Sequence, residues 1–288
     1  MTLIELITEQ SARLKKAGVS FGHGTGNAFD EAAWLVLWSL EMPLDALEDH
    51  ANDPLDDGPI AKAEALIARR IESRVPAAYL TREAWLQNVP FYIDERSIVP
   101  RSLIAELLAD GENTGILDAW LSDRTEAVLD LCTGNGSLAV IAAMAYPEIV
   151  VDAADISADA LAIARINVDR HHLAGRITLL ESDLWARVRG PYDLVLCNPP
   201  YVAEDADTGA GVREYEPHEA LFAGPEGLDE YRRLAPQLGR LLALGGLAAV
   251  EIGFDQERSV GDLFRKEGME PIAVNDLAGR PRALLIKA

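Results

Sequence analysis

The chain has 288 residues, with 47 acidic residues against 26 lysines and arginines and a formal net charge of -21. This acidic excess argues against affinity that depends on neutralising nucleic-acid phosphates or an anionic membrane surface. No apolar run approaches the roughly 18 residues that cross a bilayer, and Glu5 and Glu9 are acidic where a signal peptide would be basic and then apolar. Two cysteines, Cys132 and Cys197, cannot form a disulfide framework. We therefore expect a cytoplasmic protein with no membrane partner and no direct nucleic-acid ligand.

The first part of the chain, residues 1–75, is predicted to be a small helical domain. Apolar residues recur at helical spacing over Leu3–Leu14, and Gly18 stops that pattern. Asn27 is placed to cap a second helix, and a further helix is expected over Lys62–Arg74.

Residues 76–100 are predicted to form a β-hairpin that links this domain to the rest of the chain. The pair Val75–Pro76 breaks the helical pattern, and apolar stretches over Ala84–Leu86 and Val89–Ile93 are typical of short strands. A short helix is expected over Arg101–Ala109, where the third region, residues 101–288, begins.

From residue 127 onward, apolar strand patterns alternate with helical ones. The strands are expected at Ala127–Leu131, Ile149–Ala154, Ile177–Leu180, Tyr192–Cys197, Leu247–Ile252, Pro271–Val274 and Arg282–Ile286. The helices are expected at Ser137–Tyr146, Ala158–His171, Leu228–Leu244 and Gln256–Glu267. Alternation of this kind predicts an α/β fold with a seven-stranded, mainly parallel sheet covered by helices on both faces.

A glycine turn follows the first of these strands. Gly134-x-Gly136-x-x-Ala139 fits the fingerprint of a nucleotide site, in which small residues let a ligand approach the backbone at a helix N-terminus. Asp155 ends the next strand, 21 residues beyond Gly134, where a carboxylate can accept both hydroxyls of a ribose. The competing interpretation places Asp155 in the cap of the following helix, beside Ser157. The two features together favour a nucleoside ligand, either NAD or S-adenosylmethionine.

The tetrapeptide Asn198, Pro199, Pro200 and Tyr201 distinguishes these two ligands. It ends the fourth strand, which in a doubly wound sheet lies next to the first, so it borders the same crevice as the glycine turn. The Asn198 side-chain oxygen and the Pro199 carbonyl can accept the two N–H hydrogens of a planar amide or amine. Such contacts would hold that nitrogen facing a sulfonium methyl group, with Tyr201 as an apolar wall. Methyl transfer from S-adenosylmethionine is therefore favoured over hydride transfer.

Other candidate residues carry weaker signals. Asp183, after the third strand, is placed to accept the adenine amino group, with Leu184 against the ring. Gly22–Gly26 resembles a phosphate loop but has no lysine and no preceding strand, so we predict a turn between helices. The histidines His171, His172 and His218 show no metal-ligand spacing, and we predict no metal site.

These motifs resemble a class I, Rossmann-like S-adenosylmethionine-dependent methyltransferase, and more narrowly the N5-glutamine methyltransferases of the HemK/Prm family. The resemblance covers nearly the whole chain. It implies a substrate-recognition role for the N-terminal helical domain and binding of the glutamine amide, the acceptor, at Asn198–Tyr201. The cofactor S-adenosylmethionine is expected to lie against Asp130, Cys132, Thr133, Gly134, Asn135, Gly136, Asp155, Asp183, Leu184 and Asn198.

Two branches of this family differ in substrate, peptide release factors or ribosomal protein L-three. The release-factor branch carries Ile-Pro-Arg-Pro-Glu-Thr-Glu after the hairpin, whereas this chain has Val99–Glu106 there and resembles the ribosomal-protein branch. The resemblance thus implies a basic ribosomal protein as partner, either free or in a ribosome-assembly intermediate. The alternatives are a release-factor glutamine methyltransferase, an adenine-N6 nucleic-acid methyltransferase and a non-catalytic ribosome-assembly factor.

Overall fold

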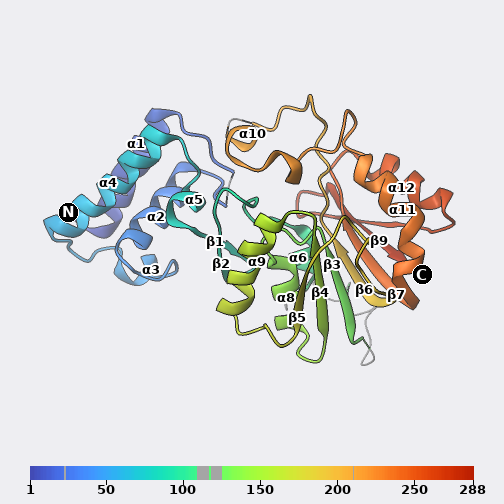
Figure 1. The fold of residues 1–288 in the computed structure, drawn as a ribbon. Coiled ribbons are helices and arrows are strands. Elements are labelled where there is room, and N and C mark those ends of the chain that lie inside the picture. The colour runs from blue at the N-terminus through green and yellow to red at the C-terminus, as the bar shows by residue number, and fades with distance from the viewer. Residues whose placement is uncertain (23, 109–116, 118–124, 210) are drawn as a thin grey trace. The chain divides into compact units, whose positions relative to one another are not determined.

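The computed structural model describes residues 1–22, 24–108, 117, 125–209 and 211–288. Its contacts divide the chain into two compact units (Figure 1). Unit 1 comprises Met1–Ala84, Ile93–Glu95 and Gly209–Tyr215, and unit 2 comprises Trp85–Tyr92, Arg96–Thr208 and Glu216–Ala288. No helix among the described residues is both long and apolar enough to cross a membrane.

Unit 1 is built of helices whose ends follow local capping chemistry. Its helices are α1 (Leu3–Ala17), α2 (Ala28–Ser39), α3 (Leu47–His50), α4 (Asp57–Ser73), α5 (Ala77–Thr81) and α10 (Val212–Tyr215). Thr2 and Glu5 form a capping box at the start of α1, and Gly18 ends that helix in the left-handed conformation, as predicted. The Asn27 side chain accepts the backbone N–H groups of Phe29 and Asp30, which confirms the predicted cap of α2.

The prediction for α4 was wrong at its N-terminus. The helix begins at Asp57 rather than Lys62, and Pro59, which was expected to lie in the preceding loop, is in its first turn. There the missing N–H of a proline would have no helical partner in any case, so the ring costs little.

A buried ion pair joins α2 to α4. The Arg70 Nε lies 2.9 Å from Glu31 Oε1, and both side chains are 2% exposed. Arg70 also donates to the Ser20 carbonyl at 2.8 Å. The Gly22 N–H donates to the Thr25 carbonyl at 2.8 Å, so the glycine segment between α1 and α2 is the predicted turn; His23 lies outside the described residues.

The predicted hairpin is present, with strands β1 (Glu83–Leu86) and β2 (Val89–Tyr92). Gln87 and Asn88 both have positive φ, 50° and 59°, as a two-residue hairpin turn with the twist of its strands requires. In unit 2, Asn167 accepts the Tyr92 N–H at 2.7 Å and donates to the Tyr92 carbonyl at 3.1 Å.

The seven-stranded sheet of unit 2 confirms the predicted α/β fold. Its strands are β3 (Ala127–Leu131), β4 (Val150–Asp155), β5 (Ile177–Glu181), β6 (Tyr192–Cys197), β7 (Leu242–Glu251), β8 (Ile272–Asn275) and β9 (Pro281–Lys287). The strand order is β5-β4-β3-β6-β7-β9-β8, with β9 antiparallel to both neighbours and the other pairings parallel. Leu131 pairs with Cys197, so the first and fourth strands are neighbours as predicted.

Helices cover both faces of this sheet (Figure 1). They are α6 (Leu103–Leu108), α8 (Ser137–Ala145), α9 (Ala158–Arg170), α11 (Asp229–Leu241) and α12 (Glu257–Lys266), with a short 3-10 helix at His218–Ala220. Residues of α6, α8 and α9 bury one face of the sheet, and residues of α11 and α12 bury the other. Because successive side chains of a strand point to opposite faces, Val128 joins the first core and Leu129 the second.

The boundary between α11 and β7 was predicted incorrectly. The helix was expected to run over Leu228–Leu244, but it ends at Leu241 and the strand begins at the next residue. Leu242 pairs with Tyr192 of β6, so strand pairing outweighs the helical pattern of the leucines. The short helix predicted over Arg101–Ala109 is observed as α6, but it begins at Leu103 rather than Arg101; its predicted last residue, Ala109, lies outside the described residues.

Candidate active site

The turn after β3 is organised around a buried carboxylate. Asp130 is fully buried, and its Oδ2 accepts the Thr133 hydroxyl at 2.5 Å and the Ala139 N–H at 3.0 Å. Burial raises the pKa of Asp130 to about 7, although these two hydrogen bonds lower it. Asp130 and Thr133 are therefore placed to hold the turn itself, and neither is among the described residues that line the nearby cavity.

The same turn needs left-handed backbone at three positions. Cys132, Gly134 and Gly136 have φ of 62°, 55° and 80°. A Cβ on Gly136 would lie 3.1 Å from the Ala164 Cβ, so glycine here lets α9 pack closely on the turn. Asn135 is buried and its side-chain oxygen accepts the Ser137 N–H at 3.1 Å. Gly134 and Cys132 line the cavity, whereas Asn135 and Gly136 are not among its described lining residues and contribute to the structure of the turn.

Asp155, at the end of β4, borders the cavity beside Gly134. Its Oδ2 accepts the Gly134 N–H at 2.8 Å and its Oδ1 accepts the Ser157 N–H at 2.9 Å. Burial raises the pKa of Asp155, and the two backbone hydrogen bonds oppose that rise. The N-cap of α9 is Ser157, whose hydroxyl accepts the Ala160 N–H, and Asp155 also takes part in this cap region by accepting the Ser157 N–H. Each carboxylate oxygen retains capacity for a further donor from the cavity.

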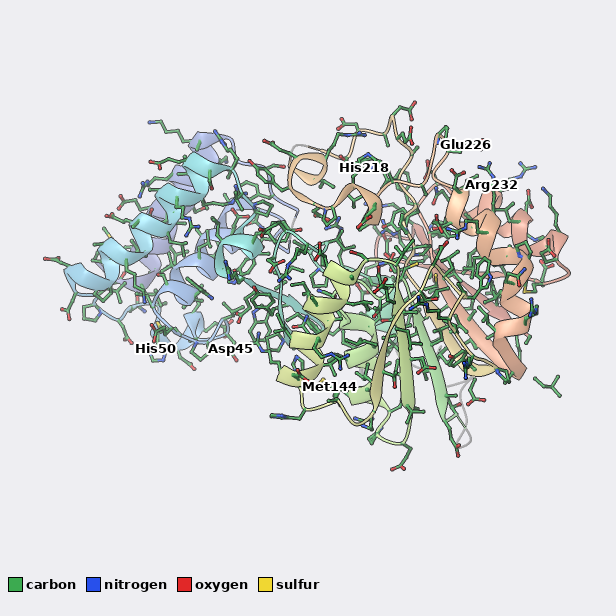
Figure 2. All side chains as sticks on the ribbon, in the orientation of Figure 1. Asp45, His50, Met144, His218, Glu226 and Arg232 are labelled. Atoms are coloured by element: carbon green, nitrogen blue, oxygen red, sulfur yellow. The ribbon has the colours of Figure 1, made fainter. Side chains whose placement is uncertain are left out.

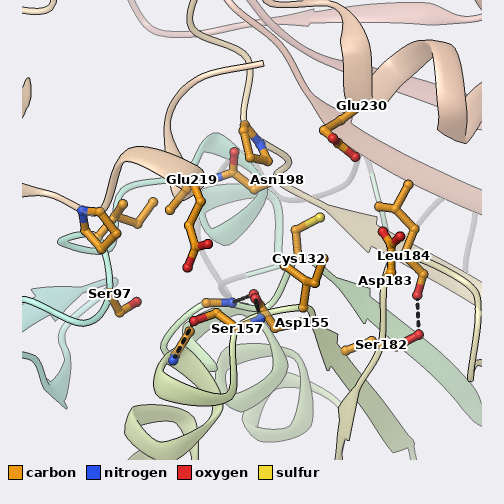
Figure 3. Close-up of a pocket in the computed structure, with 18 of the residues that line it drawn as sticks. Ser97, Cys132, Asp155, Ser157, Ser182, Asp183, Leu184, Asn198, Glu219 and Glu230 are labelled. Carbon is orange, nitrogen blue, oxygen red and sulfur yellow. Dashed lines mark hydrogen bonds between the residues drawn. The ribbon is translucent and has the colours of Figure 1, made fainter. Parts of the chain in front are cut away.

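The tetrapeptide after β6 lies at the same edge of the sheet. Asn198 lines the cavity together with Cys132 and Asp155 (Figure 3), and Pro200 lines it as well. The Asn198 Nδ2 donates to the Arg101 carbonyl at 3.4 Å, an assignment that leaves its side-chain oxygen as the free acceptor.

Pro199 is buried, and neither it nor Tyr201 is among the described cavity-lining residues. Tyr201 is held from outside the cavity, because its backbone oxygen accepts Gln256 Nε2 at 3.0 Å and its hydroxyl accepts Arg282 Nη2 at 3.2 Å. Burial raises the pKa of its hydroxyl.

The cavity has a volume of about 780 Å³, its open mouth included. It lies within unit 2, between the carboxyl ends of the parallel strands and the segments that follow them. Its described lining residues are Arg96, Ser97, Ile98, Cys132, Gly134, Ala154, Asp155, Ile156, Ser157, Ala160, Ser182, Asp183, Leu184, Asn198, Pro200, Pro217, Glu219, Ala220, Glu230 and Arg233.

The far end of the cavity is formed by the loop after β5 and by α11. Leu184 has a φ of 47° and is held there by Ser182, whose hydroxyl donates to the Leu184 carbonyl at 2.7 Å. The Asp183 Oδ1 lies 2.5 Å from Arg233 Nη2, and Arg233 Nη1 lies 3.0 Å from Glu230 Oε2. Asp183 and Leu184 thus both border the cavity.

Sequence reasoning missed four charged residues that line the cavity, Arg96, Glu219, Glu230 and Arg233. Figure 3 shows Glu219 and Glu230 among the lining side chains. The four residues come from the hairpin exit, the 3-10 helix and α11, and no local motif marks them. With Asp155 and Asp183 the lining carries four carboxylates against two arginines, which favours a ligand with a positive charge. By contrast, the neighbouring Arg232 pairs with Glu226 and Asp229 on the surface and does not line the cavity (Figure 2).

The two cysteines lie side by side as free thiols at the ends of β3 and β6. A hydrogen bond with Cys197, together with burial, raises the pKa of Cys132, so the thiol form is favoured over the thiolate. Within the part of the chain that the structure describes, no group of three or more His, Cys, Asp or Glu side chains is arranged to bind a metal ion.

Comparisons with known proteins define the class of protein to which this fold and site belong. Residues 112–214 match the family model "Methyltransferase small domain", and residues 5–81 match "PrmC N-terminal domain". The catalytic domain of hMettl16, solved in complex with the MAT2A 3'UTR hairpin 6, shares the fold at a TM-score of 0.53 and 13% identity, over 80% of this chain and 82% of that one. The chain is a methyltransferase with a Rossmann-like fold, and S-adenosylmethionine is its methyl donor.

Relatives of similar length narrow this class. The chain is 43% identical to a ribosomal protein uL3 glutamine methyltransferase of Burkholderia pseudomallei, over 100% of this chain and 94% of that protein. It is 44% identical to the protein of the same name from Bordetella pertussis, over 89% and 86%. The corresponding protein of Neisseria gonorrhoeae is 42% identical over 89% and 85%. The chain belongs to the family of ribosomal protein uL3 glutamine methyltransferases.

Proposed function

We propose that this enzyme transfers a methyl group from S-adenosylmethionine to the side-chain amide nitrogen of a glutamine in ribosomal protein uL3, the L-three protein. The observation that carries the proposal is the position of Asn198. It lines the same cavity as Gly134 and Asp155, and its amide nitrogen is engaged by the Arg101 carbonyl, so its oxygen is available to a donor. This arrangement suits an acceptor that presents N–H groups, and the names of the relatives support glutamine in uL3 as that acceptor.

The residues that line the cavity, and their charges, support S-adenosylmethionine as the ligand. All three residues expected to contact the donor here line the cavity. In our proposal Asp155 accepts the ribose hydroxyls, Asp183 accepts the adenine amino group, and Leu184 contacts the ring. Gly134 has no side chain to keep a ligand from the backbone, and the surplus of carboxylates favours a cation. When bound, S-adenosylmethionine supplies an electrophilic methyl group on a positively charged sulfur.

The tetrapeptide supplies orientation rather than a strong base. An amide nitrogen is a weak nucleophile because its lone pair is delocalised. In our proposal the Asn198 oxygen and the Pro199 carbonyl accept its two N–H hydrogens, hold it toward the methyl group and favour the charge that develops on it. Pro200 stiffens this geometry. Pro199 and Tyr201 are not among the described residues that line the cavity, so we propose their contacts for the acceptor glutamine and not for the donor, with Tyr201 as an apolar wall. The nitrogen becomes more acidic as the new bond forms, and its proton leaves to water.

The substrate is proposed to be a basic protein that reaches the site past an acidic segment. Nine acids and one base, Arg213, lie between Glu204 and Glu230 in the sequence. Such a segment attracts basic proteins and repels free RNA, and we assign substrate recognition to the N-terminal helical region, residues 1–75. This substrate implies a cytoplasmic enzyme, acting on free uL3 or on an assembly intermediate.

The proposed attraction of basic uL3 by the acidic segment, which we call its steering role, can be tested separately. We expect kcat/KM for uL3 to fall steeply between low and physiological ionic strength, because salt screens attraction between exposed charges over about 10 Å. The measurement is the initial rate at several salt concentrations with donor saturating. A rate independent of salt would remove the steering role and leave the catalytic proposal intact.

The proposed function is tested by offering the enzyme methyl-labelled S-adenosylmethionine with purified uL3, a peptide release factor and duplex DNA in parallel. We expect label in uL3 on a glutamine that mass spectrometry can map. Preferential label in the release factor would instead favour the sister activity, and label in DNA an adenine-N6 methyltransferase. Binding of S-adenosylhomocysteine without transfer to any of these would favour a non-catalytic assembly factor.

A further inference from the structure

A buried carboxylate lies directly beside the tetrapeptide and has no role in the chemistry described so far. Glu251 is the last residue of β7 and is 1% exposed. The preceding residue, Val250, pairs with Cys197 of β6, so Glu251 stands next to Asn198 across the two strands. A charged group in such a place requires partners, because an unpaired buried charge is strongly destabilising.

One arm of contacts leads from Glu251 to Asn198. The Ser102 hydroxyl donates a short hydrogen bond to Glu251 Oε2, and its oxygen accepts the Ile104 N–H at 3.1 Å at the start of α6. The adjacent residue, Arg101, provides the carbonyl that accepts the Asn198 Nδ2. Glu251 therefore fixes the segment that sets the orientation of the Asn198 amide.

The Arg101 side chain strengthens this arm. Its guanidinium makes two hydrogen bonds, of 2.8 and 2.9 Å, with the carboxylate of Glu216, whose side chain is fully buried. A bidentate pair with one buried partner has a defined geometry as well as a favourable charge interaction. The Arg101 carbonyl is thus held by contacts on both sides, from Glu216 and from the neighbouring Ser102.

A second arm leads from Glu251 to Tyr201. Arg282 Nη2 lies 3.6 Å from Glu251 Oε1 and donates to the Tyr201 hydroxyl at 3.2 Å. The other end of Tyr201 is fixed as well, since Gln256 binds its carbonyl and a Cβ on Gly227 would lie only 2.2 Å from that oxygen. Only the hydroxyl end of Tyr201 depends on the charge of Glu251.

The charged and titratable groups around Glu251 come from several elements. Arg101, Arg282, Tyr201 and Tyr231 face it, and the Tyr231 hydroxyl donates to the Glu251 backbone carbonyl at 2.7 Å. Burial raises the pKa of Glu251 to about 7, although Ser102 and the two arginines lower it. Protonation below that pH removes the charge that attracts Arg282 and weakens the hold on the Tyr201 hydroxyl.

We propose that Glu251 is a positioning residue that fixes both ends of the Asn198–Tyr201 tetrapeptide, through Ser102 and Arg101 at one end and through Arg282 at the other. The proposal rests on the proposed function, in which that tetrapeptide orients the acceptor amide. Glu251 touches neither donor nor acceptor. Its ionised form preserves an acceptor geometry in which a displacement of about 1 Å costs on the order of 10²-fold in rate.

The test is Glu251→Gln, which keeps the shape and an acceptor for Ser102 but removes the charge. We expect kcat at saturating donor to fall by about 10- to 100-fold, and Kd for S-adenosylhomocysteine to change less than about two-fold. Because the pKa of Glu251 is raised to about 7, we expect kcat of the wild type to rise with pH through about 7 and the variant to lack this rise. Arg282→Gln, in a side chain that is 31% exposed, breaks only the second arm and provides the same comparison if the first variant does not fold.

Arg265→Gln is the matched control, since Arg265 pairs with Asp262 and Glu270 on the exposed side of α12. Unchanged kcat in both Glu251→Gln and Arg282→Gln, or an unchanged pH profile in folded Glu251→Gln, would overturn the inference. Failure of the proposed function is seen separately, as a wild-type enzyme that labels a different acceptor. The ratio of variant to wild-type rates is then measured on that acceptor and decides the positioning role in the same way.

Discussion

The turn after β3 and the tetrapeptide after β6 leave neighbouring strands at one edge of the sheet, but they are held in different ways. The β3 turn is held by Asp130, which binds Thr133 and Ala139 within nine positions, and by Asp155 and Asn167, which bind it from 21 and 32 positions away. The tetrapeptide is held by Arg101, Gln256 and Arg282, which lie 55 to 97 positions away. The proposed donor side is thus set by the turn itself and the next strand and helix of the chain, whereas the acceptor side depends on residues from more distant parts of the domain.

Asn198→Ala should have the largest effect, because it changes the tetrapeptide after β6 and leaves the β3 turn intact. Loss of one acceptor at the reacting nitrogen should lower the single-turnover rate by about 10²- to 10³-fold, while Kd for S-adenosylhomocysteine changes little because the β3 turn is intact. Rapid-quench assays and calorimetry measure the two quantities. Asn275→Ala, at an exposed position ending β8, is the control. Near-wild-type turnover in Asn198→Ala would remove Asn198 from the acceptor site.

The buried Asp130 carboxyl of the β3 turn should make the free energy of unfolding depend on pH. The unfolded carboxyl loses its proton around pH 4, whereas the folded one, with a pKa of about 7, keeps it longer. The folded state therefore binds more protons in between, and the free energy of unfolding falls as pH rises, by up to about 1.4 kcal/mol per pH unit for this group.

Asp130→Asn should remove this contribution while keeping an acceptor for Thr133 and Ala139. The pKa of Glu251 is also raised, so Glu251 likewise makes the free energy of unfolding fall as pH rises. Because Glu251 is present in both the wild type and Asp130→Asn, the difference between their slopes isolates Asp130. Urea unfolding at several values between pH 5 and pH 7 measures the slope. If wild type and Asp130→Asn showed equal slopes, the buried carboxyl would not carry the titration that we assign to it.

Asp155→Ala should have a smaller effect than Asn198→Ala and the opposite pattern, because it changes donor binding and leaves the acceptor side intact. Loss of the carboxylate that faces the cavity should weaken S-adenosylhomocysteine binding by about 1–3 kcal/mol, with kcat at saturating donor affected much less. Asp159→Ala, at an exposed position in the first turn of α9, controls for the general loss of charge near this helix. Unchanged affinity in Asp155→Ala would exclude a ribose contact.

The smallest effect should come from two adjacent arginines of α11. Arg233 pairs with Asp183 and lines the cavity, whereas Arg232 is equally exposed but pairs away from it. Because exposed ion pairs contribute only about 0–1 kcal/mol, Arg233→Ala should weaken S-adenosylhomocysteine binding a few-fold and Arg232→Ala should not. Equal affinities in the two variants would show that Asp183 is positioned without Arg233.

The difference between contacts over short and long sequence distances also explains what the sequence could and could not predict. The β3 turn, the position of Asp155 and the neighbouring placement of β3 and β6 follow from short motifs and from the strand order of doubly wound sheets. Glu251, Arg282 and Arg233 carry no local pattern, because their roles arise from pairing of distant strands and helices. The start of β7 was missed for the same reason, since Tyr192 of β6 determines it.

The central claim is that the tetrapeptide presents a glutamine amide nitrogen to the methyl group. Its most direct test is to methylate uL3 with methyl-labelled donor, isolate the labelled peptide, and hydrolyse its side-chain amides in acid. Label on an amide nitrogen is released as methylamine and leaves glutamate at the modified position, which is the result that we predict. Label that stays on the peptide after hydrolysis, on a lysine, histidine or carbon atom, would contradict the account.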